Sequence, residues 1–228
     1  MNALQLIRIM QFGDSMLPVG AFAFSNGIES AIQCGIVSNV DSLRDFTRQA
    51  LQQAASGDVR AAVSCCRALS QDDRDAVLAH DRALFNRKLN AESRVMVARM
   101  GKKLAEIAVL VDGNPLLTWW LTQIKEEKTP GSYPISQAVV MSAMQIPPRD
   151  VAVIGLYGVA VTLLSAALRL MRVTHLETQR ILFEVLGEVE SLCNTAEEGG
   201  IAQMASWAPT TDVLSAMHVA AWTRLFSS

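Results

Sequence analysis

Histidines, cysteines and clustered acids are the side chains of this 228-residue chain that could hold a metal or carry acid–base chemistry. The three histidines, His80, His175 and His218, are far apart, and none has a second ligand one helical turn away. Two of the four cysteines, Cys65 and Cys66, are adjacent, so on a helix their side chains would point about 100° apart. These spacings predict no tight metal site in this chain.

Motifs for nucleotide binding and for hydrolysis are also missing. The sequence contains no GxxxxGK[ST] loop, no GxGxxG and no GxSxG. Asp72, Asp73 and Asp75 cluster where we expect a helix to begin, a place where acids favour the helix macrodipole, so we favour a helix-cap role over acid–base chemistry. We therefore expect no catalytic residue, no cofactor-binding residue, and no high-affinity binding of GTP or nickel by the isolated chain.

Composition points to a protein with a partner. Half of the residues are apolar and 18% are charged, against about 25% charged in an ordinary soluble protein. Such a chain has apolar surface to bury, which predicts a homodimer or a hetero-oligomer. The formal net charge of −2, and a basic stretch over 82–103 without interleaved aromatic residues, argue against nucleic acid. We expect reduced cysteines, no secretory signal and a cytoplasmic location.

One segment imitates a membrane span. Residues 151–168 carry no charge over 18 positions, and a helix of this length would be roughly 27 Å long, at the lower limit for crossing a bilayer. Gly155, Gly158 and Ala160 suit close helix packing in a soluble core equally well. Because only one such segment occurs, we favour a buried central helix over a span.

The elements that must position any site are helices. Apolar residues recur at helical spacing almost everywhere, and no convincing pair of strands is found. We predict an all-α fold, a single-domain bundle of about ten helices that spans residues 1–228. The predicted helices include 41–56, 59–69, 72–87, 89–111, 116–125, 135–145, 151–168, 174–192 and one from 212 to the carboxyl terminus.

Residues 14–31, with the sequence DSMLPVGAFAFSNGIESA, form the most specific motif of the chain. Pro18 fixes the backbone and Gly20 allows a turn. We expect Phe22 and Phe24 to anchor the loop, and Ser25 or Asn26 to cap a helix that carries Glu29. This segment closely resembles the N-terminal signature of the UreF-type urease accessory proteins. In that family an Asp-Ser-x-Leu-Pro-x-Gly-x-Phe run leads into Ser-x-Gly-Leu-Glu.

Further matches to this family follow in order along the chain. They are Tyr133-Pro134 before an apolar helix, the Ala-Ala-x-Arg-Leu stretch at 166–170 with Gln-Arg at 179–180, and the terminal Arg-Leu-Phe at 224–226. Between Arg169 and Gln179 the chain lacks the Pro and Gly of the usual family turn. The matches run almost from end to end, and the family is all-α, as the periodicity predicts.

The resemblance implies a non-enzymatic urease maturation factor that handles nickel only as part of a complex. Such a factor joins a UreD/UreH-type scaffold and the UreG-type GTPase on urease apoprotein, with a homodimer within the complex. It also implies partner-binding residues in the N-terminal motif and in the tail. These are Pro18, Gly20, Phe22, Ser25, Glu29, Trp222, Arg224, Leu225 and Phe226.

Other interpretations stay open on the sequence. The N-terminal residues could serve only to shape the fold, and Trp222 and Phe226 could simply complete the core. Helical spacing from Asp212 places Leu214 and Leu225 on one face, which we expect to pack on the body. Alternative functions are an all-α enzyme with an unrecognised active site and a membrane adaptor with a single span.

Overall fold

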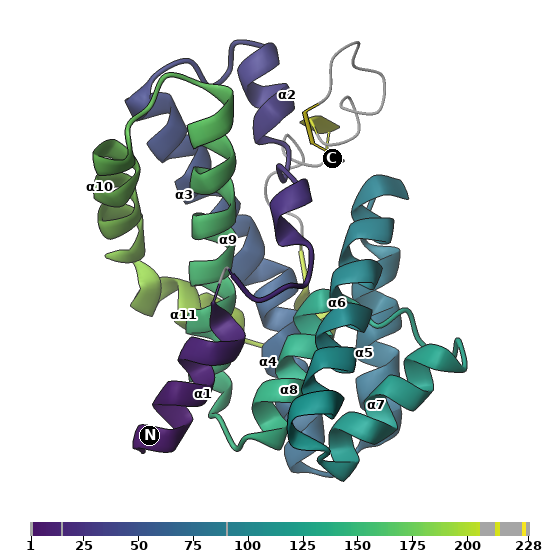
Figure 1. Cartoon of the computed structure of the whole chain (residues 1–228). Coiled ribbons are helices and arrows are strands. Elements are labelled where there is room, and N and C mark those ends of the chain that lie inside the picture. Colours follow the sequence, from purple (N-terminus) through teal and green to yellow (C-terminus); the bar gives the residue numbers. More distant parts are fainter. Residues whose placement is uncertain (1, 15, 90, 206–212, 215–224, 227–228) are drawn as a thin grey trace.

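The computed structural model describes residues 2–14, 16–89, 91–205, 213–214 and 225–226, and within them it is all-α, as predicted (Figure 1). The described residues form no strand. In the part of the chain that the structure describes, two short 3-10 helices, η1 (Ala21–Ala23) and η2 (Ile201–Gln203), accompany eleven α-helices. These are α1 (Ala3–Gly13), α2 (Ile28–Gln33), α3 (Val40–Ser56), α4 (Asp58–Ser70), α5 (Arg74–Asn86), α6 (Ala91–Asp112), α7 (Pro115–Lys125), α8 (Tyr133–Ala143), α9 (Pro148–Leu170), α10 (His175–Leu186) and α11 (Val189–Glu197).

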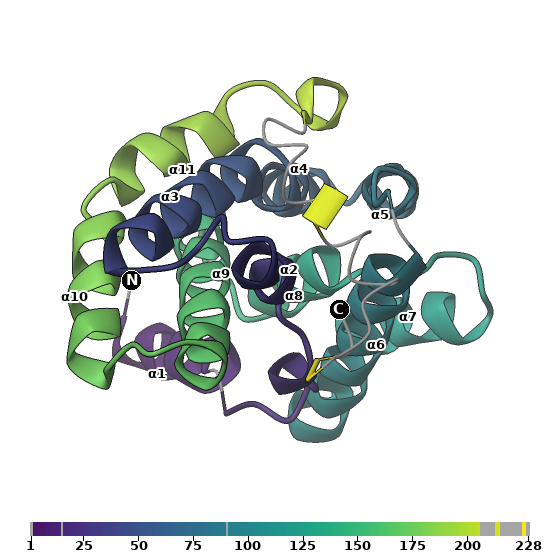
Figure 2. The ribbon, with the colours of Figure 1, turned by 90° about the horizontal axis from the view of Figure 1, so that it is seen from above.

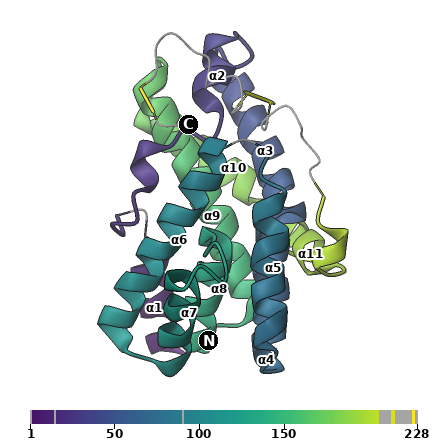
Figure 3. The same cartoon turned by 90° about the vertical axis from the view of Figure 1, so that its right-hand side faces the viewer.

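Helix α9 runs through the middle of the molecule and contacts α1, α2, α3, α4, α8, α10 and α11 (Figures 1 and 2). Two clusters of buried apolar side chains form the core, and both draw residues from α4 and α9. The first joins these helices to α5, α6, α7 and α8, which Figure 3 shows together. The second joins them to α2, α3, α10 and α11.

The uncharged segment 151–168 lies inside α9. This helix is the one candidate, among the described residues, that is long and apolar enough to cross a membrane, and half of its most apolar window is buried in the protein. At its N-terminal end Arg149 pairs with Glu190 and Glu197 of α11. Burial and these ion pairs agree with the interpretation of a core helix, since a helix that is apolar all round fits a protein interior.

Two differences from the predicted helices need correction, and a third prediction is largely untested. Helix α1 is a helix that the sequence analysis did not predict, and among its side chains only Phe12 is buried. The helix predicted over 174–192 is broken at Gly187 into α10 and α11. Most of the helix predicted from Asp212 lies outside the described residues.

Side-chain caps explain where several helices start. Asp73 accepts the backbone N–H of Ala76 at the start of α5, which confirms the role in helix capping that we expected of this acidic cluster. The turn between Arg169 and Gln179, which contains neither Pro nor Gly, is organised by a side-chain cap. There Thr174 and Glu177 form a reciprocal capping box at the start of α10.

A loop over 128–132 is clamped against α5 and α6 and sets the start of α8. The fully buried Asp81 carboxylate accepts the Thr129 hydroxyl at 2.6 Å and the backbone N–H groups of Gly131 and Ser132 at 2.7 and 2.9 Å. The loop also passes so close to Gly101 that a Cβ there would lie 1.9 Å from the Gly131 oxygen. Because both oxygens of the buried Asp81 carboxylate accept hydrogen bonds from the loop, the loop and the start of α8 are held in place.

Candidate functional site

The N-terminal motif forms an irregular loop that ends in the short helix α2. Gly20 has φ of +88°, so the turn expected at this glycine is present in a conformation that favours glycine. Pro18 is exposed beside it, and Phe22 is 74% exposed, so Phe22 does not anchor the loop by burial as expected. Phe24, the other aromatic residue expected to anchor the loop, is buried, as predicted.

Ser25 does not cap α2 as the sequence suggested. The cap position is taken by Gly27, with φ of +82° and no side-chain hydrogen bond, because the chain enters the helix through a left-handed turn. Ser25 is fully buried, and its backbone oxygen accepts the N–H of Ile28. Ser25 is therefore a buried loop residue in the folded chain, and its role in partner binding stays a prediction.

Glu29 connects the N-terminal motif to the other end of the chain. Its side chain is 2% exposed, yet one carboxylate oxygen accepts the backbone N–H of Leu225 at 2.8 Å and the other accepts that of Phe226 at 3.2 Å. Hydrogen bonds to an ionised acceptor are about twice as strong as neutral ones. Two segments nearly 200 residues apart, which the sequence analysis treated as separate sites, are therefore in contact.

Arg169, near the end of α9, completes this contact. Its guanidinium carbon lies 3.7 Å from the ring centre of Phe22 and 4.0 Å from that of Phe226, so the cation is between two aromatic side chains. Its Nη2 also donates to the backbone oxygen of Phe22 at 3.0 Å. We call the group of Phe22, Glu29, Arg169, Leu225 and Phe226 the tail clasp.

The tail residues differ from the pattern expected of a helix. Leu225 is 73% exposed, whereas Phe226 is 6% exposed, and both lie in a bend. Leu225 was expected on the packed face and is instead exposed, since helical spacing does not apply to a bend. Leu214 is buried as expected, and Trp222 and Arg224 lie outside the described residues.

Sequence reasoning missed the role of Arg169. The only signal was its place in the Ala-Ala-x-Arg-Leu match, which gave no indication of its partners. Phe22 lies 147 positions away from Arg169, and such a separation leaves no periodic trace in the sequence. The aromatic rings on both sides of the cation are visible only in the folded chain.

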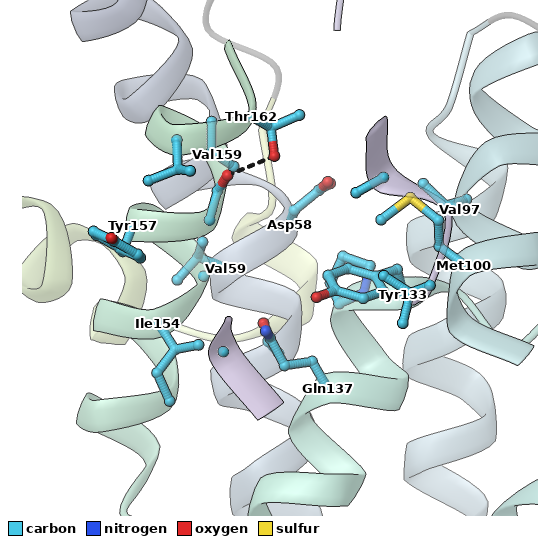
Figure 4. A pocket seen from close by; sticks show the side chains of 18 of the residues that line it. Asp58, Val59, Val97, Met100, Tyr133, Gln137, Ile154, Tyr157, Val159 and Thr162 are labelled. Atoms are coloured by element: carbon cyan, nitrogen blue, oxygen red, sulfur yellow. Dashed lines mark hydrogen bonds between the residues drawn. The ribbon is translucent and has the colours of Figure 1, made fainter. Parts of the chain in front are cut away.

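A cavity of about 150 Å³ opens between the N-terminal loop and helices α4, α6, α8 and α9 (Figure 4). Val97, Met100 and Ile154 are among the mainly apolar side chains that surround it. Tyr133 and Gln137 of α8 provide polar groups, and burial raises the pKa of Tyr133 to about 12, so this phenol stays protonated. The described residues of the wall include no serine, cysteine, histidine or lysine.

The residues that the structure describes hold no candidate metal centre, and three of the four cysteines are buried. The described residues include no group of three or more His, Cys, Asp or Glu side chains able to hold an ion. Cys65 and Cys66 are buried, and burial raises the pKa of both thiols, that of Cys66 to about 11. A thiol of this kind is a poor nucleophile and a poor metal ligand because it is rarely ionised.

Comparison with known proteins identifies the family. A family model described as UreF matches residues 37–186. The chain is 62% identical to the urease accessory protein UreF of Photorhabdus laumondii and 58% identical to those of Yersinia enterocolitica and Yersinia pseudotuberculosis, in each case over all of both chains. These relatives are named as accessory proteins, in agreement with the expected non-enzymatic role in urease maturation. The chain belongs to the UreF family of urease accessory proteins.

Proposed function

We propose that this chain is a urease maturation factor that joins a UreD/UreH-type scaffold and a UreG-type GTPase on urease apoprotein, and so helps nickel reach the active site. Family membership supports the general role in maturation. The sequence adds that the chain has no phosphate loop of its own, so GTP chemistry would be supplied by the partner. The chain binds neither nickel nor GTP tightly and acts through its surfaces.

The observation that carries the docking role is the position of the two candidate segments. Phe22 of the N-terminal loop and Leu225 of the tail are both more than 70% exposed and are held by the same clasp. Large apolar side chains beside an arginine are typical of the centre of a protein interface. We assign recruitment of the GTPase to this end of the molecule.

A second apolar surface supports an assembly with more than one interface. Helix α1 is held by Phe12 and by a hydrogen bond from the Gln5 side chain to the backbone oxygen of Gln145. Most of its other apolar side chains are exposed, including Leu4, Ile7 and Met10. We propose that the chain is a homodimer, or a hetero-oligomer with the scaffold, in the cytoplasm, and light scattering with and without the scaffold tests this.

The experiment that tests the proposed function measures urease activity and partner capture together. Cells that express urease and all other accessory proteins are compared with and without this chain, at fixed nickel. We expect activity only when the chain is present, and we expect the tagged chain to capture both scaffold and GTPase. Full activity without the chain, or capture of neither partner, would overturn the proposal.

A further inference from the structure

Two polar side chains of α8 face the cavity beside the N-terminal loop. Tyr133 and Gln137 are four residues apart, so they lie on one face of the helix, and Figure 4 shows both extending into the cavity. Gln137 is only 5% exposed. Within the part of the chain that the structure describes, neither its amide nor the Tyr133 hydroxyl has a hydrogen-bond partner. Unpaired polar groups at this depth are costly and rare in native proteins, so both are available to a ligand.

The apolar part of the wall sets the size of that ligand. The cavity holds about 150 Å³, and an apolar cavity of roughly this volume accommodates benzene in another protein. Val97, Met100 and Ile154 are among the residues that make its surface mainly apolar. A compact ring or branched chain fits this surface, and a polar group attached to it can reach α8.

Charge on the wall favours a neutral ligand. The described lining residues include no lysine, arginine or histidine that could pair with an anion. Of the two acids, Asp58 already accepts hydrogen bonds from Lys88 Nζ at 2.6 and 2.7 Å, and Asp14 is exposed to solvent. Burial raises the pKa of Tyr133 to about 12, so its hydroxyl can donate. An ion of either sign deep in the cavity would lose its hydration without gaining a partner.

We propose that this cavity is a binding site for a small neutral organic molecule with a carboxamide, or a similar group that both donates and accepts hydrogen bonds. The Gln137 amide pairs with that group in both directions, the Tyr133 hydroxyl donates to its carbonyl oxygen, and the apolar wall covers the hydrocarbon part. Val19 and Phe24 of the N-terminal loop belong to the wall, so a bound ligand also stabilises this loop. Binding at this site does not depend on the proposed role in urease maturation.

The first test compares three probes of similar size on the full-length chain. Benzamide carries the carboxamide, benzoate is its charged counterpart, and cumene replaces the carboxamide by an isopropyl group. Titrations followed by nuclear magnetic resonance of the protein should show saturable binding of benzamide, with a dissociation constant of about 1 mM or less. We expect roughly tenfold lower occupancy by benzoate and by cumene at matched concentrations. No saturable binding of benzamide, or equal binding of either control probe, would overturn the proposal.

Variants of the two polar side chains test whether they recognise the ligand. Gln137→Leu keeps the size of the side chain but removes the amide, and Tyr133→Phe removes only the hydroxyl. Benzamide affinity should fall about tenfold or more in the first variant and about three- to tenfold in the second, while cumene binds both at least as well as the wild type. Tyr157→Phe is the matched control, because Tyr157 is 43% exposed and points away from Tyr133 in Figure 4. Unchanged benzamide affinity in well-folded variants at both positions would contradict the assignment.

Urea denaturation adds a measurement on the ligand-free protein. Gln137→Leu removes an unpaired buried amide, so this variant should be at least as stable as the wild type without ligand. Saturating benzamide should raise the urea midpoint of the wild type and leave that of Gln137→Leu nearly unchanged. Strong destabilisation of ligand-free Gln137→Leu would show that the amide belongs to a structural network, and the site would then not be free to take a ligand.

Discussion

Gly101 of α6 permits the close contact that holds the loop before α8, and its replacement by alanine tests this packing. A Cβ at this position would lie 1.9 Å from the backbone oxygen of Gly131 and 2.7 Å from the backbone nitrogen of Tyr133. Both neighbours are backbone atoms, so no side-chain rotation can relieve the clash. The loop would have to move by more than about 1 Å, a shift that breaks a close-packed contact.

The cost of this movement follows from the clamp on the loop. Asp81 accepts two loop N–H groups and the Thr129 hydroxyl, and hydrogen bonds to a charged group contribute about 1.5–3 kcal/mol each. Loss of one or two of these bonds outweighs the gain of about 1 kcal/mol in helix propensity from glycine to alanine. We expect Gly101→Ala to lower the free energy of unfolding by about 3 kcal/mol, and Tm by roughly 6–12 °C for a chain of this size.

Gly158 of α9 provides a matched control in another helix. A Cβ at Gly158 would meet no atom within 4 Å, because this glycine borders the cavity. Gly158→Ala therefore gains helix propensity without a clash, and we expect the free energy of unfolding to rise by about 0.5–1 kcal/mol. Urea denaturation and thermal circular dichroism measure both variants, and a Gly101→Ala protein as stable as wild type would refute the packing argument.

Three further predictions concern buried polar groups and thiols. Asp81→Asn should lower the free energy of unfolding, measured in urea, by about 2–3 kcal/mol. The amide nitrogen of asparagine cannot accept the backbone N–H of Gly131, which a carboxylate oxygen of Asp81 now accepts. Burial lowers the pKa of His80 below 6.5. The folded protein therefore keeps its full stability above pH 6.5 and loses stability as the pH falls from 6.5 toward the folded-state pKa, because protonation of His80 then favours the unfolded chain. His80→Gln should reduce this acid sensitivity in thermal melts between about pH 5 and 8. Of the four cysteines, only the exposed Cys34 should react rapidly with a thiol reagent in the native protein, as mass spectrometry can show, and rapid labelling of Cys65 would contradict its burial.

Local patterns in the sequence were enough to predict most of the fold. Apolar spacing and capping residues identified most of the helices, including the central α9 and the acidic start of α5. Helix α1 was missed although its apolar residues recur at helical spacing; most of these side chains are exposed, and only Phe12 is buried. The break at Gly187 was missed because a single glycine inside a helical pattern is a weak turn signal. The backbone of Gly187 keeps helical dihedral angles in the structure. The prediction of a single domain stays a prediction.

The candidate site was only partly predictable, for a physical reason. The motif around Gly20 and Glu29 and the terminal Leu225 and Phe226 were identified as separate segments, and the structure brings them together. Arg169, which lies between the two aromatic rings, could not be found because its contacts depend on tertiary packing over a long sequence separation. Local propensity carries no information about which exposed ring meets which cation.

The most direct test of a maturation role is the nickel content of urease itself. Urease would be purified from cells grown at the same nickel concentration with the wild-type chain, without it, and with the chain lacking residues 225–228, and nickel per catalytic subunit measured by mass spectrometry. The proposed function predicts nickel-filled urease with the wild type and nickel-poor urease in the other two cases. Equal nickel content in urease made with and without the chain would contradict it.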